Sequence, residues 1–268
     1  MWKRLLTLLV ATAGLAGESA LAQTIPIPQP GEREFVSDLA DLISAEAEQS
    51  IKATADKLLT DTAIPIVVVT FSSMANMGFP DWRIETFATV LFDQWGVGHE
   101  NINGHSWNRG ILLIVSRDDR KARIELGADW GREFDGTCQQ IMDGVIVPKF
   151  RAGDFSAGLV EGVAALDKMA RGIEIPNLAQ RAAESRQGAA RGAGGEGASG
   201  IAGAVGGCVH GLGQMILMPF LLIAGLFSKL FGGGGGRGGG GGFSGGGGFS
   251  GGSFGGGFSG GGGATGSW

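Results

Sequence analysis

The chain has 268 residues, of which 52 are glycine, and it combines a formal net charge of -5 with only two cysteines. Two cysteines exclude a disulfide-stapled scaffold, and the absence of a basic stripe excludes nucleic acid as an expected partner. Charged residues concentrate between Glu32 and Arg191, a stretch long enough for one domain with its own hydrophobic core.

The first residues have the pattern of a secretory signal. A basic start precedes an apolar run over residues 5–16, and residues 20–22 (Ala-Leu-Ala) supply small side chains for cleavage. We therefore expect a signal peptide over residues 1–22, followed by an extended, proline-containing spacer over residues 23–34. An uncleaved N-terminal anchor is the alternative, although the apolar run is short for a membrane span.

Hydrophobic periodicity then predicts a series of helices and strands. In chain order these are a helix capped by Ser44, a strand over residues 64–69, a helix capped by Asp81, strands over 111–115 and 120–126, a helix over 141–146 and a helix capped by Asp154. The turn Asp118-Asp119 makes the second and third strands an antiparallel hairpin, and Pro148 should end or kink the third helix. The expected fold class is α/β, with a small mixed sheet of about four strands covered by helices on both faces.

Several short segments agree in order and spacing with one known family. They are residues 36–40 (Val-Ser-Asp-Leu-Ala), 66–69, 95–98 (Trp-Gly-Val-Gly), 109–113, 117–121 (Arg-Asp-Asp-Arg-Lys) and 146–155. In these segments the chain resembles the TPM domain family, and the resemblance places the domain at residues 35–172. The apolar segment and the Gly-Phe-Ser tail are also similar to those of bacterial TPM proteins of the YgcG, methanol-dehydrogenase-like type. The chain departs from the family in a longer loop over residues 99–109 and in the lack of a glutamate within residues 127–131.

The resemblance implies a divalent cation, calcium, bound by a carboxylate cleft, and a weak phosphatase activity known in plant members. Calcium takes six to eight oxygen ligands, several of them carboxylates. The carboxylates that loops at one end of the sheet could bring together are Asp38, Asp118, Asp119 and Asp135. The alternative is that each has a local role, with Asp38 and Asp135 as caps and Asp118-Asp119 as a turn.

Histidine and cysteine side chains that could carry chemistry also have simpler structural interpretations. His99 and His105 share a polar loop that could hold zinc, but their spacing matches no strong motif and a solvated surface loop is the favoured interpretation. Cys138 is expected to be a small buried hydrophobic residue. No nucleophile elbow, phosphate-binding loop or Cys-x-x-Cys motif is present in the sequence.

Composition changes after the domain. Residues 173–204 are rich in alanine, glycine and glutamine, which predicts a flexible linker with a short helix near residues 176–187. Residues 232–268 offer almost no side-chain volume to bury, so we expect a disordered tail. Its recurring phenylalanines could alternatively act as weak contact points for a partner.

Between linker and tail, residues 205–231 form one apolar stretch, which predicts a single transmembrane helix. Lys229 and Arg237 follow it, so the tail is expected in the cytoplasm. The alternative is a re-entrant or interfacial segment that leaves the tail outside, because the continuous apolar core is shorter than a usual span.

These features together predict a TPM domain held outside the bacterial cytoplasmic membrane by one span. We expect it to serve as an accessory or regulatory factor for a membrane complex, with an unidentified membrane protein as its partner. A weak metal-dependent phosphatase is the first alternative, and a structural tether that binds a partner through its tail is the second.

Overall fold

The computed structural model describes residues 24–193 and 249–268. The expected signal peptide, the apolar stretch 205–231 and the first part of the tail lie outside these residues. Within the described residues, no helix is both long enough and apolar enough to cross a membrane. The expected transmembrane helix is therefore still a prediction.

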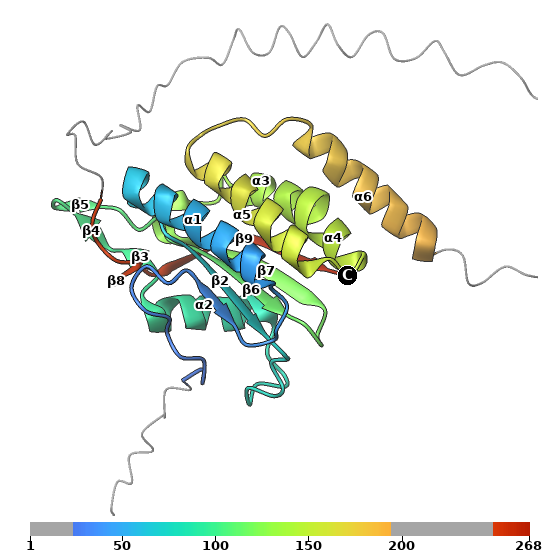
Figure 1. Cartoon of the computed structure of the whole chain (residues 1–268), viewed down its shortest axis with the longest axis horizontal. Coiled ribbons are helices and arrows are strands. Elements are labelled where there is room, and N and C mark those ends of the chain that lie inside the picture. Colours follow the sequence, from blue (N-terminus) through green and yellow to red (C-terminus); the bar gives the residue numbers. More distant parts are fainter. Residues whose placement is uncertain (1–23, 194–248) are drawn as a thin grey trace, which may run out of the picture.

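A mixed five-stranded sheet in the order β1-β2-β6-β7-β9 forms the centre of the fold (Figure 1). Its strands are β1 (Val36–Asp38), β2 (Ile66–Phe71), β6 (Ile111–Ser116), β7 (Lys121–Gly127) and β9 (Ser259–Ser267). β1, β2 and β6 are parallel, whereas β7 is antiparallel to both of its neighbours. Two small sheets, β3 (Gly98–His99) with β8 (Phe254–Gly255) and β4 (Asn101–Ile102) with β5 (His105–Ser106), lie beside it.

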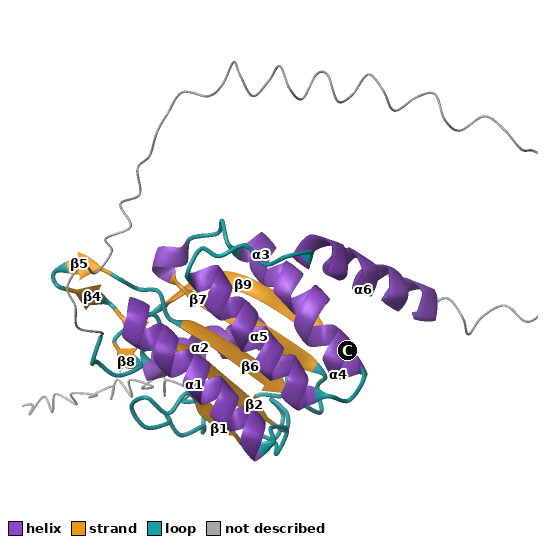
Figure 2. Ribbon diagram, turned by 45° about the horizontal axis from the view of Figure 1, so that its top comes forward, coloured by secondary structure: helices purple, strands orange, loops and turns teal. Residues whose placement is uncertain are grey.

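Helices cover both faces of the sheet, as expected for this α/β class (Figure 2). The helices are α1 (Ala45–Thr62), α2 (Ile84–Trp95), α3 (Asp135–Ile141), α4 (Val147–Arg151), α5 (Phe155–Ala170) and α6 (Leu178–Ala193). Alternate residues of the central strands divide between two cores. Val68 and Leu113 point into the core under α1, α3 and α5, while Val67 and Leu112 point into the core under α2. Burial on both faces explains why these strands are continuously apolar.

Several local predictions are confirmed. The Ser44 hydroxyl accepts a hydrogen bond from the Ala47 N–H at the start of α1, and Asp154 caps α5 in the same way. The hairpin through Asp118-Asp119 joins β6 to β7. The cap expected at Asp81 is wrong, because α2 begins at Ile84 and no side chain caps its first turn.

The kink expected at Pro148 takes the form of a wider helical turn. Residues Met142–Ile146 form a π-helical turn that connects α3 to α4, and the Val147 N–H donates to the Met142 carbonyl. Pro148 has no N–H to donate, and the wider turn places it in the first turn of α4, where that N–H is not required. The helical path therefore continues instead of ending.

Two parts of the chain differ from the expected linker and tail. The helix expected near residues 176–187 is confirmed as α6, but it is longer than expected and is not a flexible linker, because Leu178 and Ala182 are buried against the domain. Gly144 makes this close approach possible, because a Cβ there would lie 2.8 Å from the backbone nitrogen of Ala182. The expectation of disorder is wrong for the last residues of the tail, where Ser259–Ser267 form edge strand β9 beside β7.

Steric fit explains why a glycine-rich segment can form this strand. A Cβ at Gly263 would clash with the carbonyl oxygen of Ile124, and a Cβ at Gly266 would lie 2.5 Å from the Met142 Cγ. The small residues thus allow the backbone of β9 to approach β7 and α3 closely. The glycines that predicted disorder by composition serve close packing here.

We expect Gly263→Ala to lower the melting temperature of the full chain, because Gly263 has a φ of 121° and no room for a Cβ. Overpacking of this kind costs about 1–3 kcal/mol, which corresponds to a decrease of roughly 5 °C for a domain of this size. Gly261→Asn is the matched control, since asparagine tolerates the φ of 66° at that position. Differential scanning fluorimetry would show the contrast, and equal decreases for both variants would contradict the steric explanation.

Candidate functional site

Three of the four expected carboxylates lie at one end of the sheet. β1, β2 and β6 are parallel, so their carboxyl ends share an edge, with Asp38 opposite Thr70 and Phe71 opposite Ser116. Asp118 and Asp119 follow β6 at this same end. The sheet therefore brings Asp38 toward the hairpin turn, as the sequence predicted for these residues.

The oxygens of Asp38 are engaged by the chain that leads into α1. Its Oδ1 accepts a hydrogen bond of 3.1 Å from the Leu42 N–H, and its Oδ2 accepts one of 2.8 Å from the Ile43 N–H. The Thr70 hydroxyl donates to Oδ1 as well. The local role given as the alternative for Asp38 is confirmed, since this carboxylate fixes the connection between β1 and α1.

Asp119 and Asp118 have different surroundings. Asp119 Oδ2 accepts hydrogen bonds from the Met74 N–H at 2.8 Å and from the Ser116 hydroxyl at 2.6 Å, which ties the loop after β2 to the hairpin. Asp118 is half exposed and pairs with Arg117 at 2.8 Å, and this hydrogen bond lowers the pKa of the Asp118 carboxyl. Such an exposed pair contributes little to stability.

Asp135 lies at the opposite end of the sheet, because β7 runs back along β6 before α3 begins. Its Oδ1 accepts a hydrogen bond of 2.7 Å from the Gly263 N–H, and its Oδ2 pairs with Arg132 at 2.6 Å. The sequence therefore grouped Asp135 with carboxylates that it does not meet. Its partner in the tail could not be found from a helix-cap pattern.

The carboxylates as placed do not fit a calcium ion. Among the described residues, no group of three or more His, Cys, Asp or Glu side chains gathers closely enough to hold a metal. Asp38 and Asp119 already accept backbone hydrogen bonds, and the Arg117 guanidinium lies beside Asp118 and donates to the Ala40 carbonyl. A calcium site needs several oxygens that are free to point toward the ion together. Here the positive charge beside Asp118 is the guanidinium of Arg117.

Two of the three residues considered for zinc or thiol chemistry, His99 and Cys138, have structural roles. The His99 Nε2 lies 2.9 Å from the Gly252 carbonyl oxygen, and its ring packs on Phe249, so this histidine holds the tail. His105 is exposed in the small β4–β5 hairpin. Cys138 is buried beside Met169, and burial raises the pKa of its thiol to about 12. A thiol of this kind is a poor nucleophile.

A buried ion pair lies where the tail crosses β7. Arg123 and Glu125 pair at 2.8 Å, and the Glu125 side chain is completely buried. Glu125 accepts hydrogen bonds from the hydroxyls of Thr89 on α2 and Ser259 on β9, while Arg123 donates to the Gly262 carbonyl at 3.0 Å. These partners satisfy charges that would otherwise be costly to bury. The sequence showed alternation in β7 but gave no sign that its polar positions, Arg123 and Glu125, are buried between α2 and the tail.

Two further contacts fix the C-terminal end of the tail. Burial alone raises the pKa of Glu85, but hydrogen bonds from its own N–H and from the Thr265 hydroxyl outweigh it and hold the pKa below its usual value. The stabilisation from this depressed pKa is present at neutral pH and is lost as the pH falls through it. At the C-terminus, the Trp268 ring packs edge-on against the rings of Phe150 and Phe155, with distances between ring centroids of 4.8 Å and 5.8 Å.

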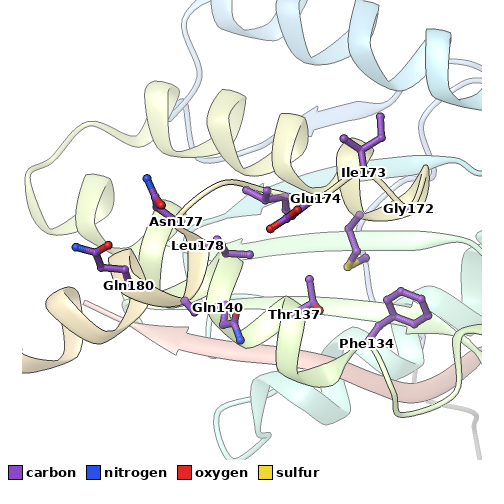
Figure 3. Close-up of a pocket in the computed structure, with 12 residues that line it drawn as sticks. Phe134, Thr137, Gln140, Gly172, Ile173, Glu174, Asn177, Leu178 and Gln180 are labelled. Atoms are coloured by element: carbon purple, nitrogen blue, oxygen red, sulfur yellow. The ribbon is translucent and has the colours of Figure 1, made fainter.

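A groove of about 490 Å³ lies between α3, the end of α5 and the start of α6 (Figure 3). One side of the groove is lined by Thr137 and Gln140 of α3 and by Phe134, which directly precedes this helix. The other side is lined by Glu174 and Asn177 of the connection to α6. Its lining mixes apolar and polar side chains without a thiol, histidine or pair of carboxylates. Glu174 is the one ionisable side chain in this lining.

Comparison with known proteins agrees with this fold. A family model described as the TPM domain matches residues 36–169. The chain belongs to the TPM domain family. The match ends within α5, so α6 and β9 are outside the matched segment of the TPM domain. None of the curated proteins matches the chain.

Solved structures of similar domains come from three bacteria. The N-terminal domain of a P. gingivalis protein is 32% identical, with 53% of this chain and 84% of that chain covered and a TM-score of 0.45. The N-terminal domain of the cg2496 protein of Corynebacterium glutamicum is 15% identical, with 53% of this chain and 84% of that chain covered and a TM-score of 0.39. The BA42 protein of Bizionia argentinensis is 20% identical, with 53% of this chain and 85% of that chain covered and a TM-score of 0.38.

Substitution of the two kinds of aspartate should separate a structural role from a surface one. We expect Asp38→Ala to reduce the free energy of unfolding by about 1–3 kcal/mol, because two backbone N–H donors and the Thr70 hydroxyl lose their acceptor. Asp118→Ala should change it by less than about 0.5 kcal/mol. Urea unfolding of the full chain measures both, and equal effects would contradict the local role of Asp38.

Proposed function

We propose that this TPM protein is a non-catalytic accessory module that acts at the membrane, outside the cytoplasm, and recognises extended chain segments through the β7 edge of its sheet. The observation that carries the proposal is the bound state of β9. Backbone pairing along β7, the Arg123–Glu125 pair and the Phe150 and Phe155 rings together hold one extended segment. Strand addition of this kind is a general mode of peptide recognition, in which the main chain supplies affinity and side-chain contacts supply specificity.

The chemistry of the described residues supports binding over catalysis. Asp38, Asp119 and Asp135 each accept backbone hydrogen bonds, and the thiol of Cys138 is buried. A phosphatase needs groups that neutralise phosphate charge and activate water. These three carboxylates instead accept hydrogen bonds that hold loops and strands of the fold in place. The phosphatase alternative and the calcium site remain predictions that no arrangement in the described residues supports.

The pairing of β9 also bears on membrane topology. β7 and β9 are hydrogen-bonded neighbours, so the chain must leave Ala193 and return at Phe249 on the same side of any membrane. A single crossing between the domain and the tail would separate these two strands, so the pairing supports the alternative in which the apolar stretch is a re-entrant or interfacial segment that leaves the tail outside. We therefore propose that the tail shares the compartment of the domain, in place of the cytoplasmic tail expected from its flanking charges.

A hydrolysis assay tests the non-catalytic proposal. We expect turnover of p-nitrophenyl phosphate with calcium, magnesium or manganese to stay at the protein-free background for both the full chain and Asp118→Ala. Asp118 is the most exposed of the four candidate carboxylates, so this variant keeps the fold and removes the one most accessible to a ligand. Turnover that falls tenfold or more in Asp118→Ala, with an unchanged melting temperature, would overturn the proposal in favour of the phosphatase.

Cysteine labelling of spheroplasts tests the topology. Ser267→Cys reports on β9 and Lys57→Cys reports on the exposed surface of α1, and in each variant Cys208, the second cysteine of the chain, is changed to serine. We expect a membrane-impermeant maleimide to label both before lysis. Labelling of Lys57→Cys alone would contradict a shared compartment. If neither is labelled before lysis, the extracytoplasmic location fails while the shared compartment stands.

A further inference from the structure

We propose that the β7 edge is an exchangeable acceptor site, and that the C-terminal strand of a second copy of this chain occupies it to join copies by strand exchange. The inference rests on the proposed function and names the partner of the same edge. Three properties of β9 carry it: its steric selectivity, its small apolar content and the length of chain that tethers it.

Steric selectivity identifies the occupant. A Cβ at position 260 or 262 would lie 2.8 Å from the Ala128 Cα or the Gly131 carbonyl oxygen, and position 263 has no room for one. The edge therefore admits an extended segment only if it is glycine at several fixed positions. The C-terminal tryptophan must also reach Phe150 and Phe155. The tail of another copy meets all these requirements, whereas an ordinary strand with side chains on both faces does not.

The small apolar content makes the bound strand releasable. Ala264 is the only residue of β9 whose apolar side chain is buried, so apolar burial within the strand itself contributes little to its attachment, and the rings of Phe254 and Trp268 on either side of the strand add the neighbouring apolar contacts. Its glycines lose more conformational freedom on docking than any other residue would. When β9 leaves, β7 becomes an edge strand with unpaired N–H and C=O groups, which is a template for pairing with another chain.

The tether allows the strand to reach a second copy. The 55 residues from 194 to 248 separate α6 from the described part of the tail. A chain of that number of residues spans up to about 180 Å when fully extended. The covalent connection therefore does not restrict β9 to the sheet of its own copy, and the balance between the two arrangements depends on how concentrated the copies are.

Disulfide trapping distinguishes exchange between copies from docking within one copy. Lys121 and Ser267 lie directly opposite each other in the β7–β9 ladder and both are exposed. We would place Lys121→Cys in one full-length copy and Ser267→Cys in another, each with Cys208→Ser, mix them in mild detergent and oxidise. Exchange predicts a covalent dimer on a non-reducing gel. Adding Gly263→Ala to the Lys121→Cys copy should increase its yield several-fold, because that copy's own tail then docks poorly.

Two controls make either result decisive. The double variant Lys121→Cys/Ser267→Cys in one chain should close a disulfide within that chain, which shows that the pair has the required geometry. Lys57→Cys, exposed on α1, replaces Lys121→Cys to measure random cross-linking. A working double variant with no mixed dimer above the Lys57→Cys level, even with Gly263→Ala present, would overturn exchange. Failure of the double variant itself would overturn the proposed strand recognition.

Discussion

The antiparallel pairing of β9 with β7 connects the other features of this structure. It covers the edge of the sheet that would otherwise expose unpaired backbone groups. It also closes the surroundings of Arg123 and Glu125, whose charges are buried between α2 and the tail. Removing one partner of such a pair typically costs about 3–5 kcal/mol. The integrity of the β7 side of the sheet therefore depends on residues at the far end of the chain.

Carboxylates act in this domain chiefly as acceptors for backbone N–H groups at points where the chain changes direction. Asp38 fixes the entry to α1, Asp119 fixes the loop after β2, Asp154 caps α5 and Asp135 receives β9. Hydrogen bonds to an ionised acceptor are stronger than neutral ones, so these positions favour aspartate for reasons of structure. An abundance of aspartate in loops is thus a weak indication of a metal site unless the oxygens are free.

The sequence predicted the parts of the fold that depend on apolar burial. The periodicity of Ile51, Ala55 and Leu58 predicted α1, and the continuous runs that became β2 and β6 predicted strands covered on both faces. β1 was missed because three residues are too few to show a period. The local role of Asp38 was recognisable as an alternative, since aspartate is favoured where loops enter helices.

β9 was missed for a different physical reason. Hydrophobic periodicity detects strands that are held by apolar side chains, and β9 is held by backbone pairing, close approach and polar contacts. Composition predicts disorder when a segment cannot bury enough apolar surface to offset its entropy. That argument does not cover a segment whose residues fit the sheet edge because their side chains are small or absent. The sequence feature that could have indicated β9 is the change from glycine to Ala264, Thr265 and Trp268 near the end of the chain. These residues supply the few side chains that hold the tail on the domain.

The order of the elements along the chain has a consequence for folding. Arg123 and Gly262 are 139 positions apart, so their contact forms only after a long segment has been closed into a loop. Non-local pairing of this kind is slow compared with the local contacts of α1 or the β6–β7 hairpin. The body of the domain can therefore form before β9 docks, which leaves the β7 edge open during that interval. Because the open edge selects glycine at fixed positions, it excludes most other strands while remaining available to the tail for which it is shaped.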